Sequence, residues 1–208
     1  MLRNVLYISG SILIFFTGLI IYGVILNLRE QTLEEILKEK GIDKLKDVHL
    51  VVNRMNYRVE LYSNKTFIKN YKAVFGKNSG TIKTSTHDLI TPLGEFKICY
   101  IDTNSRYHRF LQINYPNEKV AAEALKQGYL NENEFKTIQS SSKNNDCPPK
   151  ETRLGSNIGI HGIGKYNFIF KNLPFTFNWT NGSVAVSNEN IDEILSVVKI
   201  GTEVKITF

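Results

Sequence analysis

The hydrophobic and polar positions of the chain change pattern twice, and the first stretch is almost wholly apolar. No charged residue lies between Arg3 and Arg29. At about 1.5 Å per residue, roughly 20 helical residues cross the hydrocarbon core of a bilayer. A cleaved secretory signal usually has a shorter apolar run that ends in small residues, whereas residues 23–27 read GVILN. We therefore predict an uncleaved anchor at residues 1–28, with residues 5–27 in the membrane, over the alternatives of a signal peptide or a buried core helix.

The charges that flank this run leave its orientation open. Arg3 precedes the run, and Arg29 and two lysines follow it closely, so a count of Lys and Arg does not place the N-terminus in the cytoplasm. Beyond Arg29, apolar residues recur at helical spacing among charged ones. This pattern predicts a short amphipathic helix that ends at Gly41, within a stalk or linker spanning residues 29–46.

From about residue 47 the apolar positions alternate with polar ones, which is the period of a half-buried strand. The alternation predicts strands at residues 48–52, 57–62, 66–75, 95–101, 110–113, 158–160 and 203–208. Helical spacing predicts helices at residues 117–127 and 132–138, and a third that begins at Ser187 or Asn188. Polar loops are predicted at residues 76–90 and 139–155. Residues 47–208 are therefore predicted to form one mainly β domain, a sandwich or barrel with short helices.

The composition excludes several classes of protein and of bound ligand. With 208 residues, 42% of them hydrophobic, the chain has enough apolar side chains for one sizeable core, which excludes a disordered or collagen-like chain. The net charge of +6 suits an acidic partner such as an anionic membrane, although most surface lysines simply face water. Two cysteines and four scattered histidines offer no ligand cluster for a metal. We expect no metal, no cofactor and no nucleic-acid partner.

Two segments carry candidate chemistry. His161 ends a short apolar strand and precedes Gly162, and a histidine at a strand end beside glycine is well placed to face a cleft. In the second segment Ser183 follows Gly182 just before an apolar stretch, so a hydroxyl and two backbone N–H groups can meet at one spot, as a nucleophile and its oxyanion hole require. Structural or surface roles are expected for the other three histidines: His49, His87 and His108.

Together, the two segments resemble the signature of the L,D-transpeptidases, which cross-link bacterial peptidoglycan. That family has a His-Gly pair after an apolar strand, and one large branch continues further along the chain with Trp-Thr-x-Gly-Cys-Ile-Ala-Val-Ser/Thr-Asn. Here His161 and Gly162 are followed by residues 179–188, WTNGSVAVSN. Other segments similar to the family occur in the same order: TPLGEF (91–96), FLQINYP (110–116) and TRLG (152–155). The resemblance covers roughly residues 48–200 and implies the L,D-transpeptidase β-sandwich.

The resemblance implies acyl transfer between peptidoglycan stem peptides. In the family, the nucleophile attacks the carbonyl of the donor stem's third residue, releases the terminal D-alanine and passes the acyl group to an amine of another stem. By resemblance, His161 is the general base and acid, and Ser183 stands at the nucleophile's position. The resemblance also implies a pair of residues that support the oxyanion, Gly182 and Thr180, and three substrate contacts, Trp179, Asn181 and Gly162.

Position 183 departs from the family pattern, because Ser183 occupies the place of the nucleophilic cysteine. A thiol with a pKa of about 8.5 yields its proton readily to a nearby imidazole, whereas a serine hydroxyl needs a base in the transition state and an orienting third group. Three accounts stay open: a deliberate Cys-to-Ser substitution, a natural non-catalytic protein, or a working serine nucleophile. The rival functions are a peptidoglycan-binding envelope protein without catalysis, and an L,D-carboxypeptidase or endopeptidase that uses water as the acceptor.

The positions of the two cysteines in the sequence do not indicate that either one takes over the role of the family's nucleophilic thiol. Cys99 lies in a predicted strand and Cys147 in a predicted loop, and the sequence leaves their separation unknown. An oxidising compartment would allow them to pair, but we expect unpaired thiols. The substrate implied by the resemblance places the domain on the extracytoplasmic side of the bacterial cytoplasmic membrane, behind a single span. The oligomeric state stays open.

Overall fold

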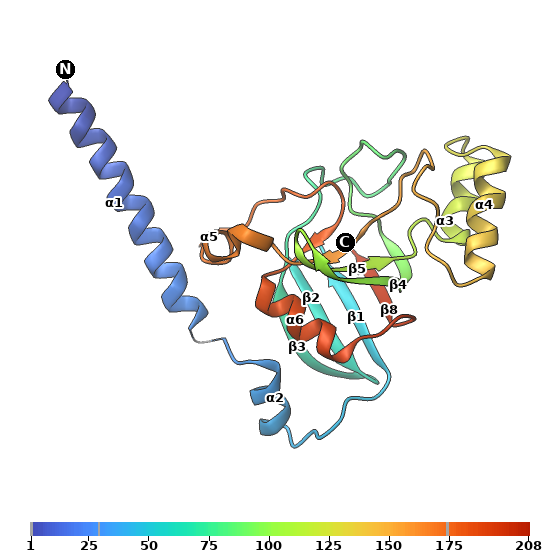
Figure 1. Cartoon of the computed structure of the whole chain (residues 1–208), viewed down its shortest axis with the longest axis horizontal. Coiled ribbons are helices and arrows are strands. Elements are labelled where there is room, and N and C mark those ends of the chain that lie inside the picture. The colour runs from blue at the N-terminus through green and yellow to red at the C-terminus, as the bar shows by residue number, and fades with distance from the viewer. Residues whose placement is uncertain (1, 29, 174) are drawn as a thin grey trace.

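The computed structural model describes residues 2–28, 30–173 and 175–208. Its first element, α1 (Leu2–Asn27), is a 26-residue helix whose side chains are almost all exposed. Figure 1 shows α1 standing out from the rest of the molecule. Among the described residues it is the one helix long and apolar enough to cross a membrane, as the apolar run predicts. Arg29, one of the charges that flank the apolar run, lies outside the described residues.

The rest of the chain folds around an eight-stranded mixed sheet with the order β3-β2-β1-β8-β4-β5-β6-β7. The strands are β1 (Val48–Asn53), β2 (Arg58–Ser63), β3 (Thr66–Lys72), β4 (Gly94–Ser105), β5 (His108–Ile113), β6 (Gly159–His161), β7 (Val184–Ala185) and β8 (Glu203–Thr207). The long strand β4 belongs to both halves of the sheet, because its first residues pair with β8 and its later residues pair with β5. The prediction of a mainly β domain with short helices is confirmed.

The alternation of apolar and polar residues decides which side of each strand is buried. On β1, Leu50 and Val52 are fully buried, while the residues beside them are only partly covered. On β8, their parallel partners Val204 and Ile206 are buried in the same way. Strands from both halves of the sheet join α6 (Asn188–Val197) in one apolar cluster. One core therefore holds the two halves together.

The helix predicted within the linker, α2 (Leu33–Glu39), packs directly on the domain. Thr32 begins it with a capping box, in which the Thr32 hydroxyl accepts from the Glu35 N–H and the Glu35 carboxylate accepts from the Thr32 N–H. Leu33 is buried in the core cluster, and its N–H donates to Glu193 on α6 at 3.1 Å. The chain is therefore fixed to the domain soon after α1 ends.

Two helices, α3 (Glu118–Lys126) and α4 (Glu132–Lys143), form a hairpin with a small apolar cluster of its own. Figure 1 shows this hairpin on the side of the molecule opposite α1. α4 is longer than predicted, since it continues through residues 139–143, which the sequence analysis assigns to a polar loop. A capping box between Asn131 and Glu134 starts the helix, and Ile138 is buried on its inner side, so the serines that follow continue it despite their weak helix preference.

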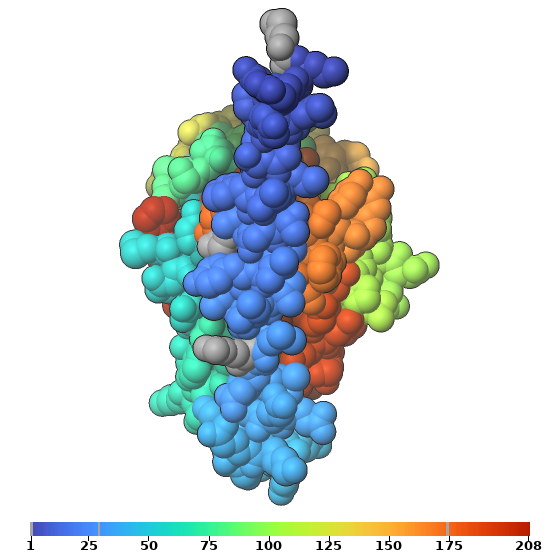
Figure 2. Space-filling model, turned by 90° about the vertical axis from the view of Figure 1, so that its left-hand side faces the viewer, coloured from blue at the N-terminus to red at the C-terminus, as the bar shows by residue number. Residues whose placement is uncertain are grey.

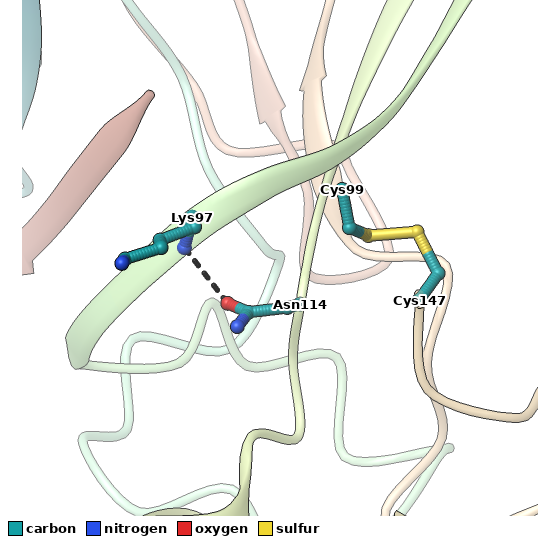
Figure 3. Close-up of a disulfide and its surroundings, with 4 residues drawn as sticks. All are labelled: Lys97, Cys99, Asn114 and Cys147. Carbon is teal, nitrogen blue, oxygen red and sulfur yellow. Dashed lines mark hydrogen bonds between the residues drawn. A yellow bond between two sulfur atoms is a disulfide. The ribbon is translucent and has the colours of Figure 1, made fainter. Parts of the chain in front are cut away.

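The two cysteines form a disulfide, Cys99–Cys147, which corrects the expectation of unpaired thiols. Their Cα atoms lie 5.3 Å apart, although 48 positions separate them in the chain. Figure 3 shows that the bond fastens the segment after α4 to β4. Beside it, the Lys97 N–H donates to Asn114 Oδ1 at 2.8 Å and links β4 to the chain that leaves β5. Sequence alone does not reveal the pairing, because it depends on how the helical hairpin packs against the sheet.

Candidate active site

The candidate site lies where the short strands β6 and β7 run side by side. In their parallel register, His161 pairs with Ala185. This register brings Ser183, the residue just before β7, next to Gly159 at the start of β6, and the Gly159 N–H donates to Ser183 Oγ at 3.3 Å. The two motifs singled out in the sequence therefore meet at one edge of the sheet.

The ring of His161 is tightly enclosed, and the residue is only 3% exposed. It stacks on Tyr107 with ring centroids 4.4 Å apart, and Trp179 meets it edge-on at 5.9 Å. Nδ1 of His161 lies 2.6 Å from the carbonyl oxygen of Gly162. Because a carbonyl oxygen only accepts, Nδ1 carries the proton and Nε2 keeps its lone pair. His161 is therefore a neutral base with a fixed tautomer.

Burial lowers the pKa of His161 from 6.5 to about 4; the hydrogen bond to Gly162 opposes this change and the positive charge of Arg106 adds to it. The imidazole is therefore uncharged at neutral pH. An imidazolium would be costly in this enclosed position. The site thus disfavours an ion pair between a charged His161 and a deprotonated residue 183 before the reaction. It favours transfer of the proton to His161 while the nucleophile forms its bond to the substrate.

The turn that carries Ser183 is shaped by Thr180. The Thr180 hydroxyl donates to the Ser183 carbonyl oxygen at 2.6 Å and accepts from the Gly182 N–H at 3.2 Å. Gly182 has a φ of +116°, and a Cβ at this position would lie 2.8 Å from the Ile90 carbonyl oxygen. Glycine is therefore required here both by backbone conformation and by the close approach of another segment.

The turn offers two backbone N–H groups, those of Gly182 and Ser183, as candidate oxyanion donors. The Gly182 N–H already donates to Thr180, which leaves the Ser183 N–H as the candidate donor from this turn. Within the described part of the chain, no direct hydrogen bond joins the His161 ring to the Ser183 hydroxyl. Nδ1 of His161 bonds to the Gly162 carbonyl oxygen, and Ser183 Oγ accepts from the Gly159 N–H. Base and nucleophile position line the same cavity without a hydrogen bond between them in the described part of the chain, and their catalytic pairing stays a prediction.

A cavity of about 840 Å³ collects most of the predicted site residues. Five of them line it: His161, Trp179, Thr180, Asn181 and Ser183. The two glycines, Gly162 and Gly182, are buried outside this lining and act through their backbones. A Cβ on Gly162 would lie 2.6 Å from the Tyr107 carbonyl oxygen, so this position needs glycine for close packing. The cavity therefore combines the nucleophile position and the base with an aromatic and an amide side chain.

Basic side chains dominate the charged groups of the cavity wall. Arg106 and Lys150 line it, whereas Asp102 is the acidic residue in the lining. A third basic residue, Lys83, is buried and paired with Asp88 at 2.6 Å. The pKa of Asp88 is lowered, because its hydrogen bonds to Lys83 and to backbone N–H groups outweigh its burial. The wall therefore suits a ligand that carries carboxylates.

Sequence reasoning misses two residues that position His161. Asn188 Oδ1 accepts from the N–H groups of Ile163 and Gly164, both at 2.9 Å, and so holds the chain that follows the histidine. The serine-asparagine pair at the end of the second motif was the available signal for Asn188. Tyr107, which stacks on the ring, comes from the β4–β5 turn, and no motif marks it because that turn meets β6 only in the folded chain.

The other three histidines take different places. His49 stacks on Tyr62 at 5.2 Å, and His108 lies 2.7 Å from Asp192, so both have structural surroundings, as expected. His87 lines the cavity, unlike the other two. A role in ligand contact is therefore open to His87, which the sequence analysis treats as a surface residue.

A comparison with protein-family models matches residues 47–206 to YkuD, the L,D-transpeptidase catalytic domain. The chain belongs to this family. The match covers the sheet, both motifs and the cavity, and leaves α1 and α2 outside it. A search of curated proteins finds no match.

Solved structures with a similar fold come from several bacteria. Bd1075 of Bdellovibrio bacteriovorus matches with a TM-score of 0.49 and 20% identity, over 78% of this chain and 48% of that one. The helical cell shape determining protein Pgp2 of Campylobacter jejuni gives 0.45 and 16%, over 84% and 55%. L,D-transpeptidase 1 of Mycobacterium tuberculosis gives 0.41 and 11%, over 78% and 62%. The chain thus matches between 48% and 62% of the length of these proteins.

Proposed function

We propose that this L,D-transpeptidase family member is anchored in a bacterial membrane and transfers acyl groups between peptidoglycan stem peptides. Family membership supports the reaction class and the substrate class. One observation carries the proposal for this chain. His161 at the end of β6 and Ser183 directly before the parallel strand β7 line one cavity, with the proton of His161 on Nδ1 and the lone pair on Nε2.

In the proposed reaction, Ser183 Oγ attacks the carbonyl carbon of the third stem residue while His161 Nε2 takes the hydroxyl proton. The Ser183 N–H donates to the resulting oxyanion. The bond to the terminal D-alanine then breaks, and its amine leaves with the proton from His161. An amine of a second stem attacks the ester and gives a proton to His161, which returns it to the departing Ser183 oxygen. The product is a cross-link, and the serine is restored.

The charges of the cavity wall support a peptide ligand of this kind. Arg106 and Lys150 line the cavity from two different segments, the β4–β5 turn and the chain that follows the disulfide. Stem peptides end in a carboxylate, which these cations attract. Trp179 adds an apolar surface beside the base. This combination suits an extended peptide with an acidic end.

A second candidate, peptidoglycan binding without catalysis, is favoured by the local geometry of Ser183. Its hydroxyl accepts from Gly159 rather than donating to His161, and burial makes His161 a weak base. A serine nucleophile needs its base in contact during attack. The third candidate, an L,D-carboxypeptidase or endopeptidase, differs only in that water replaces the acceptor amine.

Mass spectrometry of stem peptides separates the three candidates. The full chain in detergent is incubated with tetrapeptide muropeptides, and Ser183→Ala serves as the matched control. Cross-linked stems that disappear in the control support acyl transfer, and trimmed stems that disappear in the control support hydrolysis. Unchanged stems that nevertheless bind to both proteins identify a binding protein and overturn the proposed reaction.

The proposal places the domain on the extracytoplasmic side of the membrane. α1 supplies a helix long enough for a single span, and the family's substrate lies outside the cytoplasm. The Cys99–Cys147 disulfide adds independent support, because disulfides persist in oxidising compartments and are rare in the cytosol.

A further inference from the structure

An exposed aromatic patch lies on the segment that joins the two halves of the catalytic motif. Its five side chains stand on the 3₁₀ turn Gly164–Tyr166, on α5 (Asn167–Lys171) and on the chain that follows: Tyr166, Phe168, Ile169, Phe175 and Phe177. Each is between 41% and 62% exposed. Water-facing surfaces rarely gather so many large apolar side chains, and such patches mark binding surfaces.

This aromatic patch lies beside the C-terminal end of α1. Asn27 Nδ2 donates to the Lys171 carbonyl oxygen at 2.9 Å and to Asn172 Oδ1 at 2.7 Å. One turn earlier, Gly23 is buried against Asn172, and a Cβ there would lie only 1.7 Å from the Asn172 carbonyl oxygen. Figure 2 shows α5 and its surroundings, in orange, directly alongside the blue helix. The patch and α1 are therefore parts of one continuous surface.

The length of α1 sets the depth at which this contact occurs. Its 26 residues extend about 39 Å, against a hydrocarbon core of about 30 Å. About 20 residues counted from Asn4, the first residue after Arg3, end at Gly23. In a membrane, the turn from Gly23 to Asn27 then lies at the level of the lipid headgroups. Residues that contact this turn lie at the same level.

The charges around the patch favour a lipid surface as its partner. Lys165 lies over the Tyr166 ring at 4.8 Å. Lys72 donates to the Leu173 carbonyl oxygen at 3.3 Å and lines one pocket with Phe175 and Phe177, so both lysines stand next to the patch. Lys171 is neutralised by Glu189 at 2.5 Å. Aromatic side chains with flanking lysines are typical of segments that lie in the headgroup layer of anionic bilayers.

We propose that the aromatic patch inserts into the same leaflet from which α1 emerges, as a second membrane contact of the domain. This inference rests on the membrane anchoring proposed above. α5 is linked to the site through aromatic rings: the ring centroid of Phe170 on α5 lies 6.0 Å from that of Trp179, which lies 5.9 Å from that of His161. The patch thus orients the domain so that its cavity is held close to the membrane, where it meets stem peptides near the bilayer.

Fluorescence quenching in liposomes tests this contact with the full chain. A single cysteine at Phe168→Cys is labelled with the environment-sensitive fluorophore NBD, with the native disulfide left closed. The protein is reconstituted into phosphatidylglycerol–phosphatidylethanolamine liposomes that contain lipids with quencher groups on the acyl chains near the headgroup. We expect about a twofold loss of emission at this position, as for a side chain at the headgroup boundary. Adding Ile169→Ser and Phe175→Ser is expected to reduce the quenching.

Two further label positions separate the possible outcomes. Ile200→Cys is the matched control, because Ile200 is an equally exposed apolar residue outside the patch, at 59%, and its label is expected to stay unquenched. Leu13→Cys, at the middle of the 20 residues counted from Asn4, reports on α1 itself in a second set of liposomes whose quencher groups lie at the ends of the acyl chains. Quenching at Leu13 without quenching at Phe168 overturns the patch contact alone. If neither label is quenched, the membrane anchor and the patch contact are overturned together. Disulfide-linked dimers of the Phe168→Cys chain with no lipid quenching would identify a second copy as the partner, which also overturns the proposal.

Discussion

At the residue scale, the site depends on how one imidazole is held. The Gly162 carbonyl fixes the tautomer of His161, and Tyr107 and Trp179 enclose the ring. These contacts leave Nε2 as the one ring atom able to take a proton, at the cost of a low basicity. Such a weak base deprotonates an acidic nucleophile, such as a thiol, more easily than it deprotonates a serine hydroxyl.

Ser183→Cys is expected to raise transpeptidation strongly, or to create it. The thiol ionises far more easily than the hydroxyl, while the Thr180–Gly182 turn that positions residue 183 stays unchanged. Loss of a positioned nucleophile commonly costs on the order of 10³-fold, and the substitution should recover much of that factor. The measurement is cross-linking of tetrapeptide muropeptides, together with covalent labelling by a carbapenem.

The control for this substitution is Ser183→Ala, which should match the wild-type rate if the serine is inert. An inert cysteine variant that folds as well as the wild type would show that the cavity only binds. Efficient turnover by the serine protein, lost in the alanine variant, would show that Ser183 is a true nucleophile and would contradict the expected gain.

The stability of the protein is expected to fall in acid partly through His161. Burial lowers its folded pKa to about 4 from 6.5, so between these values the unfolded chain binds more protons than the folded chain. The stabilisation is fully present above pH 6.5 and is lost as the pH falls toward 4. Between pH 7 and pH 4, the wild type should lose about 3 kcal/mol more unfolding free energy than His161→Gln. Denaturant unfolding of both full chains in detergent checks this, and equal losses would contradict it.

At the scale of elements, the site is built from short strands and tied loops. β6 and β7 have only three and two residues, yet His161 ends β6 and Ser183 lies directly before β7. Neighbouring segments fix them: Asn188 holds the chain after His161, and the close approach of Ile90 requires glycine at position 182. The cavity wall at Lys150 is tied in turn by the Cys99–Cys147 bond to β4. The elements around the cavity are thus stabilised mainly by contacts far apart in sequence.

Removal of the disulfide by Cys99→Ser with Cys147→Ser is expected to destabilise the protein. The disulfide closes a loop across 48 positions and so lowers the conformational entropy of the unfolded chain. Its removal is expected to lower the free energy of unfolding by at most about 4 kcal/mol. Denaturant unfolding of the full chain in detergent, with the wild type under reducing conditions as the control, measures this loss. Substrate binding should also weaken, because the wall segment that carries Lys150 is released. Two free thiols in a non-reducing preparation of the wild type would contradict the pairing.

At the scale of the whole molecule, an apolar helix and a catalytic-type domain are joined with little free chain between them. Thr32 already caps α2, and Lys69 on β3 donates to the Gln31 carbonyl oxygen at 2.7 Å and to Glu193 at 2.6 Å. The domain is therefore held close to the end of α1 rather than at the end of a long stalk.

A C-terminal fusion is expected to report an extracytoplasmic location. The proposed single span in α1, the family's substrate and the disulfide all favour this side. A reporter enzyme that is active only outside the cytoplasm, fused after Phe208, should be active, and a reporter active only inside should be silent. The reverse pattern in intact cells would contradict the topology, and deletion of residues 1–28 serves as the control for export.

The sequence by itself determines the features that depend on neighbours along the chain. The apolar run specifies α1, because membrane-crossing length is a sum over consecutive residues. Alternation specifies most strands, and the capping pattern at Ser187 specifies the start of α6, because both reflect local backbone geometry. The two motifs identify the family and the positions of His161 and Ser183 for the same reason, since their residue types and spacing are written in the chain.

Only the tertiary structure decides the features that depend on register and packing. The parallel pairing of β6 with β7 places Ser183 beside Gly159, and the fold places Tyr107 against the His161 ring. It also forms the disulfide and brings α5 to the end of α1. In each case the partners are distant in sequence, and their approach depends on how strands, loops and helices share one core. Local patterns do not encode these distances, which explains why the thiols were expected to be unpaired and the α5 surface was not foreseen.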